Sequence, residues 1–366
     1  MDACSRQHFA NPSSLHGGGV VAARALANAR ARVAHVLGTH PDEIIFTGGG
    51  TEANNLAIFG TWTPGVQVIT TAIEHASVLE PAKKLGAVFL PVNSEGLVDL
   101  KKLKEALTPE TKLVSIIYAH NEIGVIQPVK EIAKIIRHFR KLSSDPRYPY
   151  LHLDACQASR FLDLNVSRLG VDLMTLNASK IYGPHGVGCL YARRGLQLEP
   201  QLIGGGQENG RRAGTENVAG AIGLATALEI CEENKIKESA RLSQLRDELI
   251  AGLLKIEGVT LNGPAPDSQT ERLPNNVNVS VAGVEGEQMV LELDARGIAC
   301  STGAACAISD HDDSHVIMAL GKNQAMAEGA VRFTLGRDTT RADIKYVLKS
   351  FTEVFKKYAP NTKFKI

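Results

Sequence analysis

The sequence carries almost no excess of charge of either sign, and this limits the surfaces that the chain can bind. Its 366 residues include 40 Lys and Arg against 39 Asp and Glu, which gives a formal net charge of +1. Binding to nucleic acid or to an anionic membrane favours a basic excess, so we expect no direct nucleic-acid or membrane partner. Long apolar runs and a signal peptide are also missing, and we therefore expect a cytoplasmic protein.

Metal-binding patterns are equally scarce. None of the six cysteines belongs to a C-x-x-C pair, so the sequence predicts no structural zinc site. In a chain of this size we expect reduced thiols, most of them small core residues. The acidic and histidine-containing run 309–313 suggests a metal site, but we interpret it as a solvated loop. We therefore expect no bound metal.

What the sequence does contain is the composition of an ordinary soluble globular protein, with 44% hydrophobic and 22% charged residues. Its length suggests two domains, each able to bury its own core. Short apolar strands alternate with helical segments, which predicts an α/β domain, and an α+β pattern follows the long helical segment 219–256. We expect a large domain over 1–236 and a small C-terminal domain over 237–366.

The expected elements are bounded by polar or glycine-rich turns. The strands expected in the large domain are 43–47, 66–73, 87–92, 112–118 and 151–154. The elements expected in the small domain are strands 276–281 and 297–300, helices 286–296 and 314–320, and a closing helix 341–357.

Residues 171–191 form the centre of the predicted site. They read as a buried strand, a loop with one lysine, a Gly/Pro turn and a second apolar strand. Lys180 has apolar neighbours along the chain, so we expect its side chain inside a site. A lysine in such surroundings loses its charge easily and becomes the nucleophilic amine that Schiff-base chemistry needs. From this stretch alone, a surface lysine at a strand end is an equally good interpretation.

Three other polar groups follow expected strands. Residues 48–51 join a strand to a helix, where backbone N–H groups can cradle a phosphate, although a plain glycine turn is an equal alternative. His75 stands where a strand gives way to a helix, and a lone histidine there is more often structural. Asp154 ends an apolar strand, where a carboxylate needs a positive partner such as the ring nitrogen of pyridoxal phosphate.

Two loops are unusually rich in small residues. Residues 202–218 contain a long glycine-rich segment, which is uncommon in a compact domain unless the loop has a function. Cys306 ends the run STGAAC and precedes a polar stretch. A thiol on such a loop is able to move between two reaction partners, and the alternative interpretation is a small buried residue.

Taken in order, these motifs resemble the cysteine desulfurases of the NifS/IscS type, which belong to the class V aminotransferases and to the fold-type I pyridoxal phosphate enzymes. The motifs are FTGGGTEANNLAI, EHASV, NEIGVIQPV, DACQ, SKIYGPHGVG, GGGQENGRRAGTENV, STGAAC and VRFTLGR. The resemblance implies a large domain whose mostly parallel sheet is flanked by helices, and a smaller α+β domain that carries the loop of the nucleophilic cysteine.

The resemblance also implies that the chain binds pyridoxal 5'-phosphate. Lys180 matches the lysine that binds the cofactor covalently, His75 the histidine that stacks on the ring, and Asp154 the carboxylate at the ring nitrogen. Gln157 matches the group near the phenolic oxygen. Thr215 matches a threonine that reaches the phosphate in the partner subunit, which implies a homodimer. The other positions implied in cofactor binding are Gly50, Thr51, Asn177 and Ser179.

For the substrate, the resemblance implies that Asn121 and Arg332 bind a carboxylate and that Cys306 becomes a persulfide. The implied reaction removes sulfur from L-cysteine to give L-alanine, and the sulfur then passes to an acceptor or iron–sulfur scaffold protein. Three alternatives remain open: a selenocysteine lyase, an aminotransferase of the same fold, and an inactive structural or interaction protein. The last follows from the lack of a Y-L-D-N-A-A-T-T-like segment, with which the family normally begins.

Overall fold

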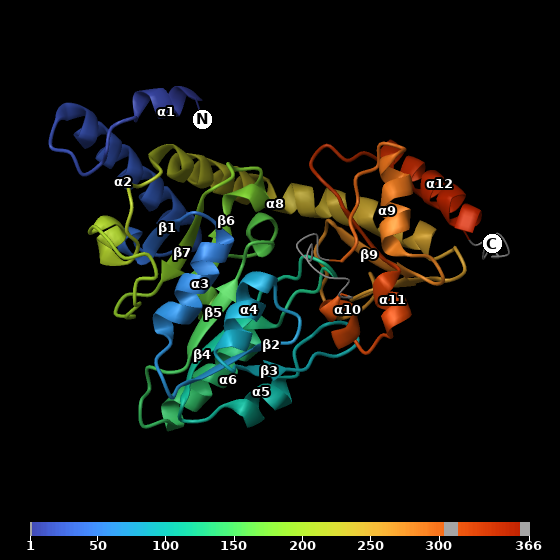
Figure 1. Cartoon of the computed structure of the whole chain (residues 1–366), viewed down its shortest axis with the longest axis horizontal. Coiled ribbons are helices and arrows are strands. Elements are labelled where there is room, and N and C mark those ends of the chain that lie inside the picture. Colours follow the sequence, from blue (N-terminus) through green and yellow to red (C-terminus); the bar gives the residue numbers. More distant parts are fainter. Residues whose placement is uncertain (1, 304–313, 359–366) are drawn as a thin grey trace. The chain divides into compact units, whose positions relative to one another are not determined.

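The computed structural model describes residues 2–303 and 314–358, which form two compact units (Figure 1). The first unit contains the chain up to Leu90, Leu100–Tyr118 and Pro128–Lys235. The second contains Pro91–Asp99, Ala119–Gln127 and the chain from Ile236 onward. Two short segments of the expected large domain therefore belong to the second unit. The division into domains at residue 236 stays a prediction, because compactness does not test independent folding.

The first unit is built around a seven-stranded sheet in the order β1-β7-β6-β5-β4-β2-β3. Its strands are β1 (Ile44–Thr47), β2 (Gln67–Thr71), β3 (Val88–Leu90), β4 (Thr111–Ile117), β5 (Tyr150–Asp154), β6 (Leu173–Asn177) and β7 (Gly188–Ala192). Only β7 runs antiparallel to its neighbours, β1 and β6, so all the other strands point the same way. The predicted mostly parallel sheet is confirmed. Because β7 is buried along its whole length, it reads as an apolar run, whereas the equally buried β5 contains His152 and Asp154.

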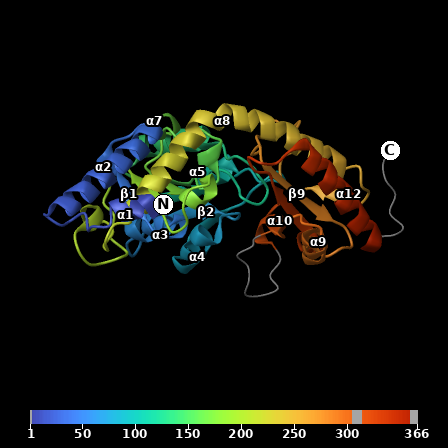
Figure 2. The same cartoon turned by 90° about the horizontal axis from the view of Figure 1, so that it is seen from above.

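Helices cover both faces of this sheet. They are α2 (Gly17–Leu37), α3 (Gly50–Thr61), α4 (Ala76–Lys84), α5 (Leu100–Ala106), α6 (Val129–Leu142), α7 (Val166–Leu169) and the first part of α8 (Val218–Leu253), and the short helix α1 (Asp2–Gln7) precedes them. Right-handed crossovers put α3 and α4 on one face and α5, α6 and α7 on the other, and Figure 2 shows α3 and α4 on the opposite side of the strands from α5 and α7. The side chain of Arg32 on α2 binds Glu229 on α8, with Nε 2.9 Å from Oε1. Short 3-10 helices cover Pro41–Glu43, Ala158–Arg160, Ala178–Ile181 and Gln207–Gly210.

The helices pack as their apolar periodicity predicts. In α6, the buried residues recur at the i, i+3, i+4, i+7 spacing of one helix face: Val129, Ile132, Ala133 and Ile136. The sequence of this helix is basic elsewhere, so its other face remains in water. One stripe of apolar residues therefore suffices to hold α6 on the sheet.

The second unit has an antiparallel sheet in the order β10-β9-β8. Its strands are β8 (Val259–Leu261), β9 (Asn276–Val281) and β10 (Ala330–Thr334). Its helices, besides the end of α8, are α9 (Gly286–Asp294), α10 (His315–Ala319), α11 (Gln324–Glu328) and α12 (Arg341–Tyr358). Helix α12 packs against α9, as Figure 2 shows.

The expected strand 297–300 is wrong. Gly297 has a φ of +76°, and the backbone N–H of Ile298 donates to the carbonyl of Leu293, so this segment closes the end of α9. Pairing begins only at Ser301, which forms an isolated bridge with Arg332. A left-handed glycine turns the chain where an extended strand would have to begin.

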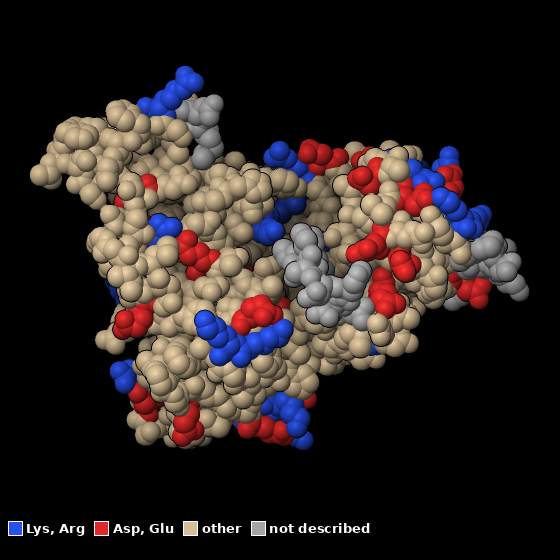
Figure 3. Space-filling model, in the orientation of Figure 1, with Lys and Arg blue, Asp and Glu red and all other residues tan. Residues whose placement is uncertain are grey.

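Charges on the surface are mixed rather than segregated. Figure 3 shows Lys and Arg interspersed with Asp and Glu on the face that it draws. Several are paired, such as Arg194 with Asp42 at 2.6 Å and Arg212 with Glu52 at 2.8 Å. Among the helices that the structure describes, none is both long and apolar enough to cross a membrane.

Candidate active site

The carboxyl ends of the parallel strands meet at one edge of the sheet in the first unit. Residues 48–51 follow β1, His75 follows β2, Asp154 ends β5, and Lys180 follows β6. In open α/β sheets, this edge is where ligands bind, because loops and helix N-termini converge there. Four groups that the sequence separates by up to about 130 residues therefore lie at the ends of strands of one sheet.

Asp154 is a buried acidic group at this edge, with 4% of its surface exposed. Its Oδ1 accepts from the backbone N–H of Cys156 at 3.0 Å, and its Oδ2 accepts from Nδ2 of Asn54 at 2.8 Å. Both donors are neutral, and no Lys, Arg or His in the described ranges forms an ion pair with this carboxylate. A buried carboxylate with neutral donors alone is costly. The protonated ring nitrogen of a pyridine would supply the missing positive charge, so the residues present fit that group.

A chain of hydrogen bonds joins Asp154 to His75. Nδ2 of Asn54 also donates to Oγ of Ser77 at 2.8 Å, and Oγ of Ser77 lies 2.8 Å from Nδ1 of His75. Nδ1 of His75 accepts from the backbone N–H of Ser77 at 3.1 Å, which caps α4. Because Nδ1 accepts, the proton of the neutral ring is on Nε2. The network therefore fixes the orientation and the tautomer of His75.

Sequence reasoning missed Asn54 and Ser77. Asn54 is 1% exposed and lies on α3 among the buried residues Ala53, Ala57 and Ile58. A polar side chain on the apolar face of a helix was the available signal, because a buried amide must find partners. Ser77 was visible only as part of the EHAS motif.

Two other titratable side chains near Asp154 have raised pKa values. Burial raises the pKa of Glu74 to about 8, and the charge of Asp154 adds to this shift. Glu74 accepts from Oγ1 of Thr71 at 2.6 Å and from the backbone N–H of Ile117 at 3.0 Å. Burial and then the charge of Asp154 raise the pKa of Cys156 well above its usual value.

The glycine turn before α3 is shaped by close contacts. Gly49 caps the helix with a φ of 153°, and Thr51 is exposed in the first turn. A Cβ at Gly188 would lie 2.8 Å from the backbone carbon of Gly49, so only glycine fits beside the turn. The positive end of the helix dipole lies at this turn, as the predicted phosphate cradle requires, and the N–H of Gly48 donates to Oε2 of Glu52 at 2.8 Å.

We expect Gly50→Ala to destabilise the protein by about 1–3 kcal/mol, because the new methyl group overpacks the turn. A Cβ at Gly50 would lie 2.8 Å from Sγ of Cys156 and 3.4 Å from Cβ of Asn177. Replacing Cys156 with glycine in the same chain removes the closest atom and should restore part of the loss. Urea unfolding of the single and double variants tests this. An unchanged midpoint for Gly50→Ala would contradict it.

Lys180 lies in the turn Ala178–Ile181 that follows β6. The turn directs Ile181 into the core, with 2% of its surface exposed, and directs Lys180 outward, so its side chain is exposed. The expectation that apolar neighbours enclose Lys180 is therefore wrong for the isolated chain. Asn177 shapes the turn, because its Oδ1 accepts from the backbone N–H of Ser179 at 3.4 Å and from Oγ of Ser179 at 3.3 Å.

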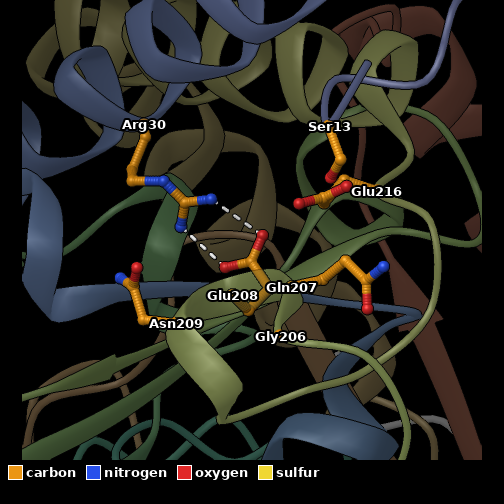
Figure 4. A pocket seen from close by; sticks show the side chains of 7 residues that line it. All are labelled: Ser13, Arg30, Gly206, Gln207, Glu208, Asn209 and Glu216. Atoms are coloured by element: carbon orange, nitrogen blue, oxygen red, sulfur yellow. Dashed lines mark hydrogen bonds and ion pairs between the residues drawn. The ribbon is translucent and has the colours of Figure 1, made fainter. Parts of the chain in front are cut away.

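The glycine-rich loop borders a polar cavity of about 390 Å³ (Figure 4). Arg30 binds both carboxylate oxygens of Glu208 at 2.7 Å, and Glu208 also accepts from the backbone N–H of Phe46 at 3.0 Å. The pair therefore anchors the loop to β1. The cavity is lined by Ser13, Arg30, Gly206, Gln207, Glu208, Asn209 and Glu216, none of which was predicted to bind the cofactor. Of the predicted residues, Thr215 is exposed on this loop and Gln157 is half-buried after β5.

The second unit carries the two residues predicted to bind the substrate carboxylate. Arg332 on β10 donates through Nη1 to the carbonyl of Asn121 at 3.3 Å, and both residues are half-buried. Cys306 and the run 309–313 lie outside the described residues. Within the described residues, no group of three or more His, Cys, Asp or Glu is placed to hold a metal ion.

A mainly parallel seven-stranded sheet, with a buried carboxylate and a lysine after adjacent strands at its carboxyl edge, defines a fold-type I pyridoxal phosphate enzyme. The sequence model of the aminotransferase class-V family matches residues 1–347. The chain belongs to this family, whose members depend on pyridoxal phosphate.

Individual relatives show to which members of the family the chain is similar. The chain is 45% identical over 362 residues to cysteine desulfurase IscS of Dictyoglomus turgidum, a match that covers 96% of this chain and 89% of the relative. A solved NifS-like protein superposes with a TM-score of 0.88 at 34% identity, covering 97% of this chain and 94% of that one. The structure of SspA in complex with cysteine gives 0.75 at 30% identity, covering 90% and 91%. The resemblance to cysteine desulfurases of the NifS/IscS type is confirmed.

Proposed function

We propose that the chain is a cysteine desulfurase that uses pyridoxal 5'-phosphate to convert L-cysteine into L-alanine and an enzyme-bound persulfide. The observation that carries the proposal is the buried Asp154 carboxylate, which has only neutral donors and is linked through Asn54 and Ser77 to His75. The cysteine desulfurases among the relatives support the same activity.

Residues of the first unit would hold the cofactor. When bound, pyridoxal phosphate supplies an electron sink for negative charge at the substrate Cα. Asp154 would keep a proton on the ring nitrogen, and His75 would stack on the ring with its Nε2 proton available. The amine of Lys180 would bind the cofactor covalently and would then move the proton of Cα. The remaining proposed cofactor residues are Gly50, Thr51, Gln157, Asn177, Ser179 and Thr215.

Residues of the second unit would bind the substrate carboxylate. The guanidinium of Arg332 presents donors in a planar fork that matches both carboxylate oxygens. The side-chain amide of Asn121 would add one donor. The carbonyl of Asn121 already accepts from Nη1 of Arg332, so the two residues are held next to one another.

Cys306 is the proposed nucleophile. Its thiolate would form a bond to the substrate sulfur while the Cβ–S bond breaks, and the carbon fragment would take up a proton and leave as L-alanine. Thiolates react and thiols do not, so cysteines with raised pKa values are poor candidates. Burial raises the pKa of Cys300 to about 11 and that of Cys189 to about 12.

The experiment that tests this function is incubation of cofactor-loaded protein with L-cysteine and a reductant. We expect alanine and sulfide in equal amounts. Parallel incubations contain L-selenocysteine, or L-alanine with a 2-oxo acid. Turnover of selenocysteine alone, or amino-group transfer without sulfide, would replace the proposal with a lyase or an aminotransferase.

We also propose that the chain works as a homodimer, because the loop that carries Thr215 exposes large apolar side chains. Ile203 is 89% exposed and Leu202 is 45% exposed. Apolar side chains on such a loop favour burial against a second chain. Sedimentation should show a dimer, and Ile203→Asp should shift it toward monomer. Leu142→Asp, at a site 76% exposed on α6, is the matched control. An active wild-type monomer would contradict the proposal.

The proposed recipient of the sulfur is an acceptor or iron–sulfur scaffold protein, and the proposed location is the cytoplasm. A thiol of the acceptor would attack the outer sulfur of the persulfide, by the chemistry of thiol–disulfide exchange. Transfer of labelled sulfur from the loaded enzyme to an added acceptor protein measures this step.

A further inference from the structure

Asn276, the first residue of β9, is buried. Its side-chain amide binds the turn at residues 121–124, which is distant in sequence. The residue is 2% exposed. Its Nδ2 donates to the carbonyl of Asn121 at 3.2 Å and to the carbonyl of Glu122 at 2.9 Å. Both hydrogens of the amide are therefore used on two successive peptide carbonyls. A side chain that binds two consecutive carbonyls fixes the planes of both peptide groups.

The side-chain oxygen of Asn276 is also held by hydrogen bonding. Oδ1 of Asn276 accepts from Nη2 of Arg272 at 3.2 Å, and the carbonyl of Asn276 accepts from Nε of Arg272 at 3.0 Å. Arg272 is 7% exposed, and its Nη1 donates to the carbonyls of Asn262 and Pro264 at 3.0 and 2.6 Å. The guanidinium is thus bound by oxygen atoms of the surrounding backbone. This arrangement prevents rotation of the Asn276 side chain.

Arg332 shares one of the acceptors that Asn276 holds. The carbonyl of Asn121 accepts from Nη1 of Arg332 at 3.3 Å as well as from Asn276. The turn also packs directly on the amide, because a Cβ at Gly124 would lie 2.7 Å from Oδ1 of Asn276. The carbonyl of Asn121 therefore binds both Asn276 and Arg332, and its position determines where the Asn121 side chain begins and where Nη1 of Arg332 is held.

We propose that Asn276, oriented by Arg272, is a positioning residue for recognition of the substrate carboxylate. It touches neither substrate nor cofactor and acts through the carbonyl of Asn121, which sets the direction of the Asn121 amide and of the Arg332 guanidinium. The inference rests on the proposed function, because it takes Asn121 and Arg332 as the carboxylate-binding pair. It predicts a defect that depends on the carboxylate of the ligand and not on its amine.

The test compares the binding of L-alanine and ethylamine, two amines that differ in the carboxylate and are followed through the absorbance of the cofactor in loaded protein. Asn276→Ala leaves buried carbonyls without donors, and we expect it to weaken L-alanine binding about tenfold or more. Ethylamine binding should stay unchanged. Equal weakening of both amines, or no weakening of either, would overturn the inference.

Two further variants separate positioning from general damage. Asn276→Asp keeps the shape and the acceptor for Arg272 but loses both N–H donors, so it should lose L-alanine binding while remaining folded. Normal L-alanine binding by this variant would refute the inference. Asn262→Ala is the control, because the buried Asn262 amide donates to Asn278 and Ser280 and not to the turn. It should leave the ratio of the two affinities unchanged.

A double-variant cycle tests the route through Arg332. Residues that act through one shared contact give non-additive effects. Asn276→Ala combined with Arg332→Ala should therefore bind L-alanine no more weakly than Arg332→Ala alone, and full additivity would contradict the shared route. Failure of the wild-type protein to release alanine from L-cysteine would refute the proposed function instead, because the binding comparison needs no desulfuration.

Discussion

Protein in which Lys180 is replaced by alanine should form no alanine from L-cysteine, with a loss of about a thousandfold or more. The loss combines a covalent attachment with proton transfer at Cα, and general acid–base catalysis alone contributes about 10²–10⁴-fold. Lys180 is placed for both roles by the turn that follows β6, and its amine is exposed at the edge of the sheet. Borohydride reduction of the loaded variant, followed by mass spectrometry, should find no covalent cofactor.

The control for this experiment is a lysine with no proposed role. The side chain of Lys101 on α5 is 83% exposed and lies 3.9 Å from Glu105. Lys101→Ala should keep both the covalent cofactor and full alanine formation, because exposed ion pairs contribute little to stability. A reduced cofactor adduct on any lysine other than Lys180 in the wild-type protein would show that the assignment is wrong.

The sequence predicted the groups that follow strands. His75, Asp154 and Lys180 each come after an apolar run, and such runs are the simplest feature of a buried parallel strand. Their convergence follows from one fact about topology, that parallel strands end at the same edge. The sheet and the main groups at its edge were therefore predictable without coordinates.

The supporting contacts were not predictable in this way, because they depend on how elements pack. Asn54 reaches Asp154 across 100 residues and reaches Ser77 across 23. Periodicity places Asn54 on a face of α3 but does not reveal which side chains of α4 and β5 meet that face. Asn276 is a similar case, since the sequence around it reads as the start of an ordinary strand. Its amide turns out to bind a turn 154–155 residues earlier.

Conformation at single residues explains the remaining differences. Apolar neighbours along the chain suggested an enclosed Lys180, but the turn after β6 alternates directions, so Ile181 points inward and Lys180 outward. The strand expected at 297–300 does not form, because the positive φ of Gly297 closes α9. Both outcomes follow from backbone geometry over three or four residues. Composition and periodicity are read over longer windows and therefore do not reveal it.

Cys306→Ser should abolish alanine release while leaving the cofactor bound as in the wild-type protein. A hydroxyl is a far weaker nucleophile than a thiolate toward sulfur, so the bond to the substrate sulfur should not form. Cofactor binding depends on Lys180 and Asp154 in the first unit, so the covalent cofactor should still be found after borohydride reduction. Mass spectrometry after brief exposure of the wild-type protein to L-cysteine should find one additional sulfur, on Cys306.

Cys300 is the matched control, because it lies six residues away and is also a single thiol. Burial and the charge of Asp294 raise its pKa to about 11, so at neutral pH it is a thiol and not a thiolate. Cys300→Ser should therefore release alanine at the wild-type rate. An added sulfur on Cys300 in place of Cys306, or undiminished alanine release by Cys306→Ser, would move the nucleophile to another cysteine. The raised pKa values of Cys156, Cys189 and Cys300 make that outcome physically unfavourable, since each would first have to give up a proton in buried surroundings.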